Sequence, residues 1–257
     1  MRLVVLVLLL LVVAVPGARA DPASYVALGD SYSSGVGAGP YVRDGTACRR
    51  SRAAYPALVA RSRGLRLDLR ACSGATIGDV RRSQLAGLSR STRYLTISVG
   101  GNDAGFTRVL TACAKPWWLA HCGREIDRAR AVIDQALPGA LHRLYDDLRT
   151  RAPNARVVVV GYPRLFAGED CDAGTFFSPG EQARLNRTAD RLDQVLAAAA
   201  RAQGFAFADP TRTFLGHALC EPAPWLHGLS RPLAESFHPN RAGHAQGLAP
   251  LVGSLLR

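Results

Sequence analysis

The sequence has 257 residues, of which 48% are hydrophobic, 20% charged and 7% aromatic, and this balance excludes a mostly disordered chain. The 32 lysines and arginines exceed the 20 aspartates and glutamates, which gives a formal charge of +12 at pH 7. A basic chain can bind nucleic acid. However, Lys115 is the only lysine, and the arginines are scattered without a basic run beyond Arg49-Arg50 or Arg81-Arg82, so no nucleic-acid partner is expected.

The N-terminal segment has the pattern of a secretory signal peptide. Arg2 precedes an uninterrupted apolar run over 3–15, and residues 18–20 read Ala-Arg-Ala, the small-x-small pattern of a cleavage site. The apolar run is shorter than the ~20 residues that a membrane-spanning helix needs, which disfavours the alternative of a retained anchor. We therefore expect cleavage near Ala20, secretion of the mature chain, and a single domain over 21–257.

The rest of the chain alternates strand and helix patterns. Strands are predicted over 24–28, 65–69, 94–99, 156–161 and 205–208, and helices over 53–63, 78–88, 124–151, 178–203 and 240–256. Pro138-Gly139 is expected to break or kink the third helix, and Ser178, Pro179 and Glu181 form the pattern of a capped helix start. This alternation predicts an α/β fold with a parallel sheet covered on both faces, and a ligand site beyond the carboxyl ends of its strands.

The six cysteines of a secreted chain are expected to form disulfides. Neighbours in the sequence suggest the pairs Cys48–Cys72, Cys113–Cys122 and Cys171–Cys220. A zinc site is the alternative, but the sequence contains no C-x-x-C pair, and His121 beside Cys122 lacks the usual partner spacing. No metal is expected. The glycines over 35–39 do not fit the dinucleotide-binding pattern, and no cofactor is expected either.

Three clusters of polar and small residues come directly after predicted strands. Ser31 follows Gly29-Asp30 on a strand-to-helix turn, where a serine hydroxyl is exposed and can act as a nucleophile. Gly74 allows the backbone to approach a reacting atom closely, and Asn102 can donate a hydrogen bond to a developing oxyanion. Each cluster alone is also compatible with an ordinary polar turn.

A fourth cluster precedes the last predicted helix. His238 can be the general base for a serine hydroxyl because the pKa of a histidine lies near the working pH, and Pro239 restricts its backbone. A lone histidine is more often structural. The four clusters together nevertheless outweigh their separate structural interpretations, and the absence of a G-x-S-x-G pentapeptide argues against the ordinary α/β-hydrolase fold.

In this order the clusters resemble the SGNH hydrolases, also called GDSL esterases/lipases, over essentially the whole mature chain. The motifs that carry the resemblance are Gly29-Asp30-Ser31, Gly74, Gly101-Asn102-Asp103 and Phe237-His238-Pro239. The number of cysteines and the string Gly-Gly-Asn-Asp-Ala-Gly-Phe over 100–106 look most like the secreted actinobacterial esterases and phospholipases of that family. The resemblance implies a flavodoxin-like, three-layer α/β/α sandwich with a mainly parallel central sheet.

The resemblance also implies a reaction and its residues. Ser31 would be the nucleophile of an acyl-enzyme mechanism, and His238 would be its general base. The oxyanion hole would consist of the N–H groups of Ser31 and Gly74 and the side-chain amide of Asn102. The implied substrate is a carboxylic ester, and an esterase, a lipase and a phospholipase all remain open.

One position departs from the family pattern. Where the family often has an aspartate three residues before the histidine, this sequence has Glu235, and either its carboxylate or the backbone carbonyl of Ser236 could orient the imidazole of His238. A monomer in transient contact with a lipid surface is expected, with the run over 116–119 (Pro-Trp-Trp-Leu) as the candidate for that contact. The alternative function is a non-catalytic secreted module that binds anionic polymers or lipid headgroups.

Overall fold

The computed structural model describes residues 23–119 and 121–257, so the predicted signal peptide over 1–20 lies outside the described residues. A five-stranded sheet forms its centre, with β1 (Ser24–Gly29), β2 (Arg66–Leu69), β3 (Tyr94–Ser98), β4 (Arg156–Val160) and β5 (Ala206–Ala208). The strands are ordered β2-β1-β3-β4-β5, and every neighbouring pair is parallel. This is the flavodoxin-like order, which confirms the predicted parallel sheet.

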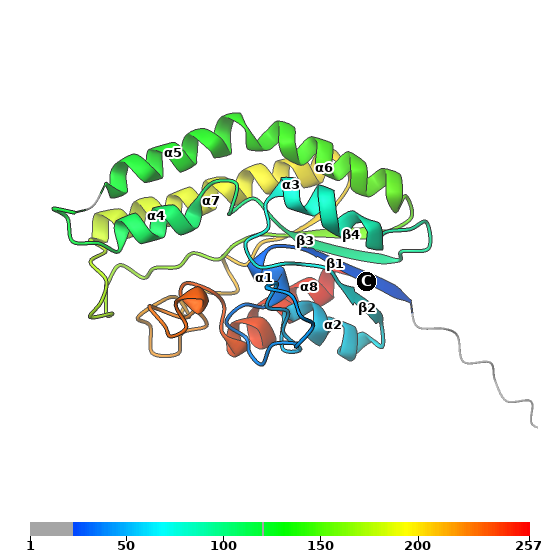
Figure 1. The fold of residues 1–257 in the computed structure, drawn as a ribbon, viewed down its shortest axis with the longest axis horizontal. Helices are drawn as coiled ribbons and strands as arrows, with labels where there is room; N and C mark the ends of the chain where they lie inside the picture. The colour runs from blue at the N-terminus through cyan, green and yellow to red at the C-terminus, as the bar shows by residue number, and fades with distance from the viewer. Residues whose placement is uncertain (1–22, 120) are drawn as a thin grey trace, which may run out of the picture.

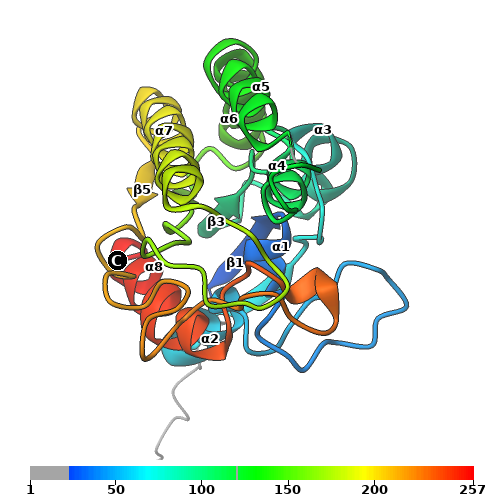
Figure 2. The same ribbon diagram turned by 90° about the vertical axis from the view of Figure 1, so that its left-hand side faces the viewer.

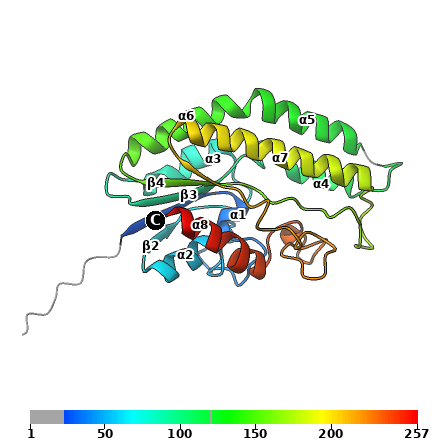
Figure 3. The ribbon, with the colours of Figure 1, turned by 180° about the vertical axis from the view of Figure 1, so that it is seen from behind.

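Helices cover both faces of the sheet (Figures 1 and 3). One face carries α3 (Ile77–Asp79), α5 (Cys122–Gln135), α6 (Leu137–Arg151) and α7 (Pro179–Ala202), and the other carries α2 (Tyr55–Arg63) and α8 (Ala249–Leu255). The short α1 (Ser31–Ser34) and α4 (Phe106–Cys113) lie toward the end where the strands finish. The predicted three-layer α/β/α architecture is therefore confirmed. Within the described ranges, no helix is long and apolar enough to span a bilayer.

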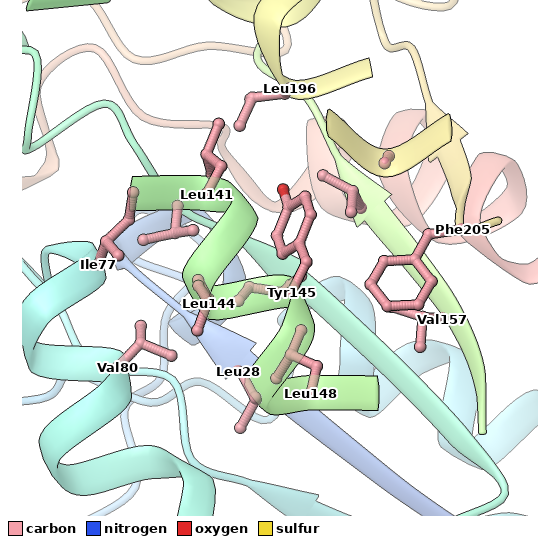
Figure 4. Close-up of a cluster of buried hydrophobic side chains, with 14 of the residues drawn as sticks. Leu28, Ile77, Val80, Leu141, Leu144, Tyr145, Leu148, Val157, Leu196 and Phe205 are labelled. Carbon is pink, nitrogen blue, oxygen red and sulfur yellow. The ribbon is translucent and has the colours of Figure 1, made fainter. Parts of the chain in front are cut away.

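Strand β4 shows how the sheet builds a core on each side. Because successive side chains of a strand point to opposite faces, Val157 and Val159 join the cluster under α6 and α7, whereas Val158 and Val160 join the cluster on the other face. Figure 4 shows the first cluster, in which Tyr145 and its neighbours on α6 lie over the sheet. The unbroken apolar run of β4 is the result of burial on both faces.

Two of the predicted helices have wider or tighter turns than an α-helix. The segment predicted over 78–88 consists of α3, the π-helix η1 (Val80–Gln84) and the 3-10 turn η2 (Leu85–Gly87). The predicted last helix contains the π-helix η4 (Gly243–Leu248) followed by α8. Apolar periodicity does not reveal such local changes, because they re-aim single side chains without moving the buried face.

The break at Pro138 is placed differently from the prediction. Helix α5 ends at Gln135 and α6 begins at Leu137, so Pro138 lies in the first turn of α6, where its missing N–H costs no hydrogen bond. Helix α4 was not predicted, because it is short and buries only Val109 and Cys113. The start of α7 follows the prediction: Ser178 and Glu181 form a reciprocal capping box.

Candidate active site

Ser31 lies where β1 ends, next to the point at which the strand order reverses between β1 and β3. Such switch points are the usual ligand sites of open parallel sheets. Gly29, the last residue of β1, has a φ of +118°, and a Cβ there would lie 2.1 Å from the carbonyl oxygen of Ser98. Only glycine therefore allows the end of β1 to approach β3 this closely. The approach sets Ser31 beside the loop that carries Asn102.

The buried Asp30 holds the turn before Ser31. Its carboxylate accepts hydrogen bonds from the backbone N–H of Tyr32 (3.0 Å) and from the hydroxyl of Tyr162 (2.6 Å). The Tyr162 hydroxyl in turn accepts from the N–H of Gly101 (3.3 Å). Burial raises the pKa of the Asp30 carboxyl to about 7. Tyr162 thus joins the turn that carries Ser31 to the loop after β3.

Gly74 and Asn102 lie on neighbouring loops that are bonded to each other. The side-chain amide of Asn102 donates to the carbonyl of Ala75 (3.0 Å), and the N–H of Ile77 donates to the carboxylate of Asp103 (3.1 and 3.2 Å to its two oxygens). Gly74 has a φ of +80°, and a Cβ there would face open space. Among the described residues, the N–H groups of Ser31 and Gly74 have no hydrogen-bond acceptor. Both N–H groups can therefore bind a ligand.

His238 contacts Ser31 directly. Its Nε2 lies 2.8 Å from the Ser31 hydroxyl oxygen, and its Nδ1 lies 2.9 Å from the backbone carbonyl oxygen of Ser236. A carbonyl can only accept, so Nδ1 carries the proton, and Nε2 is free to accept from the serine O–H. Burial lowers the pKa of His238 to about 4, which keeps the imidazole neutral at pH 7. The pair has the geometry of a nucleophile and its general base.

Glu235 does not contact the imidazole of His238. Its carboxylate accepts from the hydroxyl of Tyr41 (2.6 Å), which itself accepts from the N–H of Gly37 (3.0 Å). Partial burial and the hydrogen bond to Glu235 raise the pKa of Tyr41 to about 12. The sequence left open whether Glu235 or the Ser236 carbonyl faces the imidazole of His238. The structure places the Ser236 carbonyl at His238, and it places the Glu235 carboxylate between the loop that carries His238 and the loop after α1.

Two further contacts join these loops. The ring Nε2 of His227 lies 2.9 Å from the carbonyl oxygen of Gly37, and the hydroxyl of Tyr32 donates to the carbonyl of Phe237 (3.0 Å). The ring of Tyr32 also lies 5.4 Å from that of His238. The residue after the candidate nucleophile therefore supports the backbone of the histidine loop.

Three residues around the site were missed by the sequence analysis. Tyr162 is the second residue after β4, so the rule that ligands bind beyond strand ends could have found it. Tyr41 lies in a loop. Gln84 lies in η1, where its amide exchanges two hydrogen bonds with the backbone of Gly29, at 2.7 and 2.9 Å. No sequence pattern marks the last two residues, because their partners are distant in the chain.

The cysteines form the three disulfides Cys48–Cys72, Cys113–Cys122 and Cys171–Cys220, the pairs that proximity in the sequence suggested. No cysteine is left to ligate zinc. In the part of the chain that the structure describes, no group of three or more His, Cys, Asp or Glu side chains could hold a metal ion. The first disulfide joins the loop after α1 to the loop that carries Gly74, and so it braces the site.

Comparisons with known proteins place this geometry in context. The family model of the GDSL-like Lipase/Acylhydrolase family matches residues 27–246. A lipase of Streptomyces rimosus is 45% identical, with 94% of this chain and 90% of that protein covered, and Lipase 1 of Streptomyces coelicolor is 44% identical, with 91% and 88% covered.

Two crystal structures are similar at high coverage. The extracellular lipase of Streptomyces rimosus superposes with a TM-score of 0.85 at 44% identity and covers 90% of this chain and 99% of its own. Phospholipase A1 of Streptomyces albidoflavus NA297 superposes with the same TM-score at 40% identity and covers 91% and 99%.

Proposed function

The chain belongs to the GDSL-like lipase/acylhydrolase family and is a carboxylic ester hydrolase, and we propose that its reaction is carried out by Ser31 as nucleophile and His238 as general base. The observation that carries the proposal is the 2.8 Å contact between the Ser31 hydroxyl and the unprotonated Nε2 of a partly buried, neutral His238. A nucleophile within hydrogen-bond reach of an oriented base is the arrangement that acyl transfer requires.

The first half of the reaction transfers the acyl group to the enzyme. The Ser31 oxygen attacks the ester carbonyl carbon while His238 Nε2 takes the hydroxyl proton, and the carbonyl oxygen becomes an oxyanion. The N–H groups of Ser31 and Gly74 and the second N–H of the Asn102 amide bind that oxyanion. When the C–O bond to the alcohol breaks, the imidazolium of His238 gives its proton to the leaving oxygen.

The second half repeats these steps with water. His238 Nε2 removes a proton from a water molecule as its oxygen attacks the acyl carbon, and the same donors bind the second oxyanion. The bond to Ser31 then breaks, Ser31 regains its proton from His238, and the carboxylic acid leaves. We assign orientation of His238 to the Ser236 carbonyl, 2.9 Å from Nδ1, and treat Glu235 as a positioning residue that acts through Tyr41.

We infer that the natural esters include lipids, as the names of the related lipases and the phospholipase A1 support. The enzyme then works in transient contact with a lipid surface, as a monomer. We also propose that it is secreted after cleavage near Ala20 and that 21–257 form a single domain, which the extracellular relative supports. N-terminal sequencing of secreted protein should begin at Asp21, and an intact Met1 would contradict this.

Hydrolysis of a soluble p-nitrophenyl ester tests the catalytic assignment. Ser31→Ala and His238→Ala should each lower kcat by about 10⁴ to 10⁶-fold, because each removes a group without which the covalent step cannot proceed. Thermal unfolding of both variants serves as the folding control. Hydrolysis that survives Ser31→Ala would overturn the assignment and would favour a non-catalytic binding module. Profiling of acyl chain and headgroup would then define the lipid class.

A further inference from the structure

Among the described residues, the exposed large apolar side chains are confined to segments at one end of the sheet. In the described ranges there are seven, and all of them lie in the segments between β3 and α5, between β4 and α7, or after β5: Trp117, Trp118, Leu119, Phe176, Leu215, Leu229 and Leu233. These segments are at the carboxyl ends of the strands, the end that also carries Ser31 and His238, and Figure 2 views the molecule from that end. We call these seven residues the apolar rim.

The most exposed part of the apolar rim is the turn over 117–119. Trp117, Trp118 and Leu119 are 83%, 64% and 63% exposed. The turn projects beyond α4 and α5, whose facing ends are joined by the Cys113–Cys122 disulfide. The N–H of Leu119 donates to the carbonyl of Pro116 (2.8 Å), so the three side chains are presented on an ordered turn. Clustered exposed apolar groups of this kind mark an interaction surface, and tryptophan favours the boundary between water and lipid.

The charges next to this turn are positive. Lys115 and Arg124 are exposed and have no ion-pair partner within the described residues. The nearby carboxylates are neutralised, because Glu125 pairs with Arg108 and Arg128, and Asp127 pairs with Arg184. A surface cavity of about 280 Å³ beside the turn is lined by Arg108, Lys115 and His121, together with Leu119 and Glu125. This surface is complementary to an anionic headgroup and repels a second copy of itself.

We propose that the enzyme docks on phospholipid surfaces that contain anionic lipid, with the turn over 117–119 inserted among the lipids and Lys115 and Arg124 at the headgroups. The proposal deepens the proposed function, because docking by the apolar rim turns the end that carries Ser31 toward its substrate. The arrangement is that of a peripheral enzyme whose binding combines buried apolar area with attraction to anionic headgroups.

Vesicle binding by the Ser31→Ala protein, which would not consume the lipid, tests this docking. Co-sedimentation with phosphatidylcholine vesicles that contain phosphatidylglycerol should weaken by more than about ten-fold in the Trp117→Ala/Trp118→Ala double variant, whereas Trp117→Phe/Trp118→Phe should retain most of the binding. Tryptophan emission should shift to the blue on binding. Binding by the alanine variant that equals the parent's would overturn the proposal.

The charge contribution has its own matched pair of variants. Lys115→Ala should weaken binding to the anionic vesicles about five-fold, corresponding to about 1 kcal/mol for one cation near the surface. Arg90→Ala, which removes an exposed cation from the turn before β3 at the opposite end, should leave binding unchanged. Equal losses in the two variants, or no preference for anionic vesicles over pure phosphatidylcholine, would contradict the assignment of anionic lipid.

A soluble short-chain ester separates this proposal from the proposed function. In the enzyme with Ser31 intact, Trp117→Ala/Trp118→Ala should leave kcat/KM for that ester unchanged and lower the rate on vesicle lipid. Loss of both activities would mean that the tryptophans act in catalysis or folding, and it would overturn the docking role. Sedimentation that shows a dimer dispersed by the same substitutions would identify the face as a contact between copies and would also refute it. Failure of the Ser31 assignment would appear instead as hydrolysis by Ser31→Ala.

Discussion

The two ends of the sheet are built in different ways. At the amino end the chain enters the strands through the short segments 64–65, 88–93, 152–155 and 203–205, whose hydrogen bonds are mostly local. At the carboxyl end, the long segments 35–54, 161–178 and 209–242 are held by side chains from distant parts of the chain, such as Tyr162 on Asp30 and Tyr41 on Glu235. All three disulfides lie at that end.

We infer from this difference that the carboxyl end of the sheet serves catalysis, whereas the amino end contributes only to stability. A reacting centre needs side chains fixed to within a fraction of an ångström, and loops achieve this only when bonds from several directions hold them. The amino end needs only to connect elements, for which local turns suffice. Loss of a side chain that fixes the reacting groups at the carboxyl end should therefore lower rates, whereas substitutions at the amino end should change only the free energy of unfolding.

The largest effect at the carboxyl end, apart from the loss of Ser31 or His238, is expected for Asn102→Ala. The substitution should lower kcat by about 10² to 10³-fold, because it removes one of the proposed donors to the oxyanion. Steady-state kinetics with a p-nitrophenyl ester measures the loss. Urea unfolding provides the control, since Asn102 also bonds the carbonyl of Ala75. A decrease below ten-fold would remove Asn102 from the oxyanion hole.

The acid limb of the pH profile tests the burial of His238. In the proposed mechanism the base works in its neutral form, and burial lowers the pKa of His238 to about 4. The value of kcat/KM should therefore persist as the pH falls below 6.5 and be lost only as the pH passes through about 4. At pH 5 about 90% of the activity should remain, against about 3% for an ordinary histidine. Asp30→Asn removes the separate titration of Asp30. An apparent pKa near 6.5 for the acid limb of that variant's kcat/KM profile would show that the His238 imidazole is solvated.

Tyr162→Phe and Thr92→Val compare the two ends directly. Tyr162→Phe leaves the N–H of Gly101 without an acceptor and leaves Asp30 with only the Tyr32 N–H as a donor. It should lower both kcat, by about ten-fold, and the free energy of unfolding, by about 1–3 kcal/mol. Thr92→Val at the amino end removes the acceptor of the Ser89 N–H and should cost about 1 kcal/mol without changing kcat. Equal kinetic effects would erase the distinction between the ends.

The smallest effect is expected for Glu235→Gln. Glutamine can still accept from the Tyr41 hydroxyl, and the Ser236 carbonyl still faces His238 Nδ1, so kcat/KM should stay within about two-fold of the wild-type value. The measurement is the same ester assay at pH 7. A loss close to that of His238→Ala would instead show that the Glu235 carboxylate orients the imidazole.

Much of the fold was predictable because it depends on local patterns. The run over 156–160 reads as a strand buried on both faces, and Ser178 with Glu181 reads as a helix start, since each signal lies within a few residues. The π-helical turns and α4 were not predictable in this way. In the π-helix η1, the side-chain amide of Gln84 bonds to the backbone of Gly29. These two residues are 55 positions apart in the chain, so no local sequence window contains both.

The sequence by itself determined the order of the elements, the parallel sheet and the four short motifs that contain Ser31, Gly74, Asn102 and His238. Only the tertiary structure decided which groups around those residues touch. It places the Ser236 carbonyl on His238, directs Glu235 to Tyr41, and recruits Tyr162 to the turn before Ser31. The physical reason is that motifs depend on neighbours along the chain, whereas hydrogen bonds between loops depend on how the strands are ordered and how closely their ends approach.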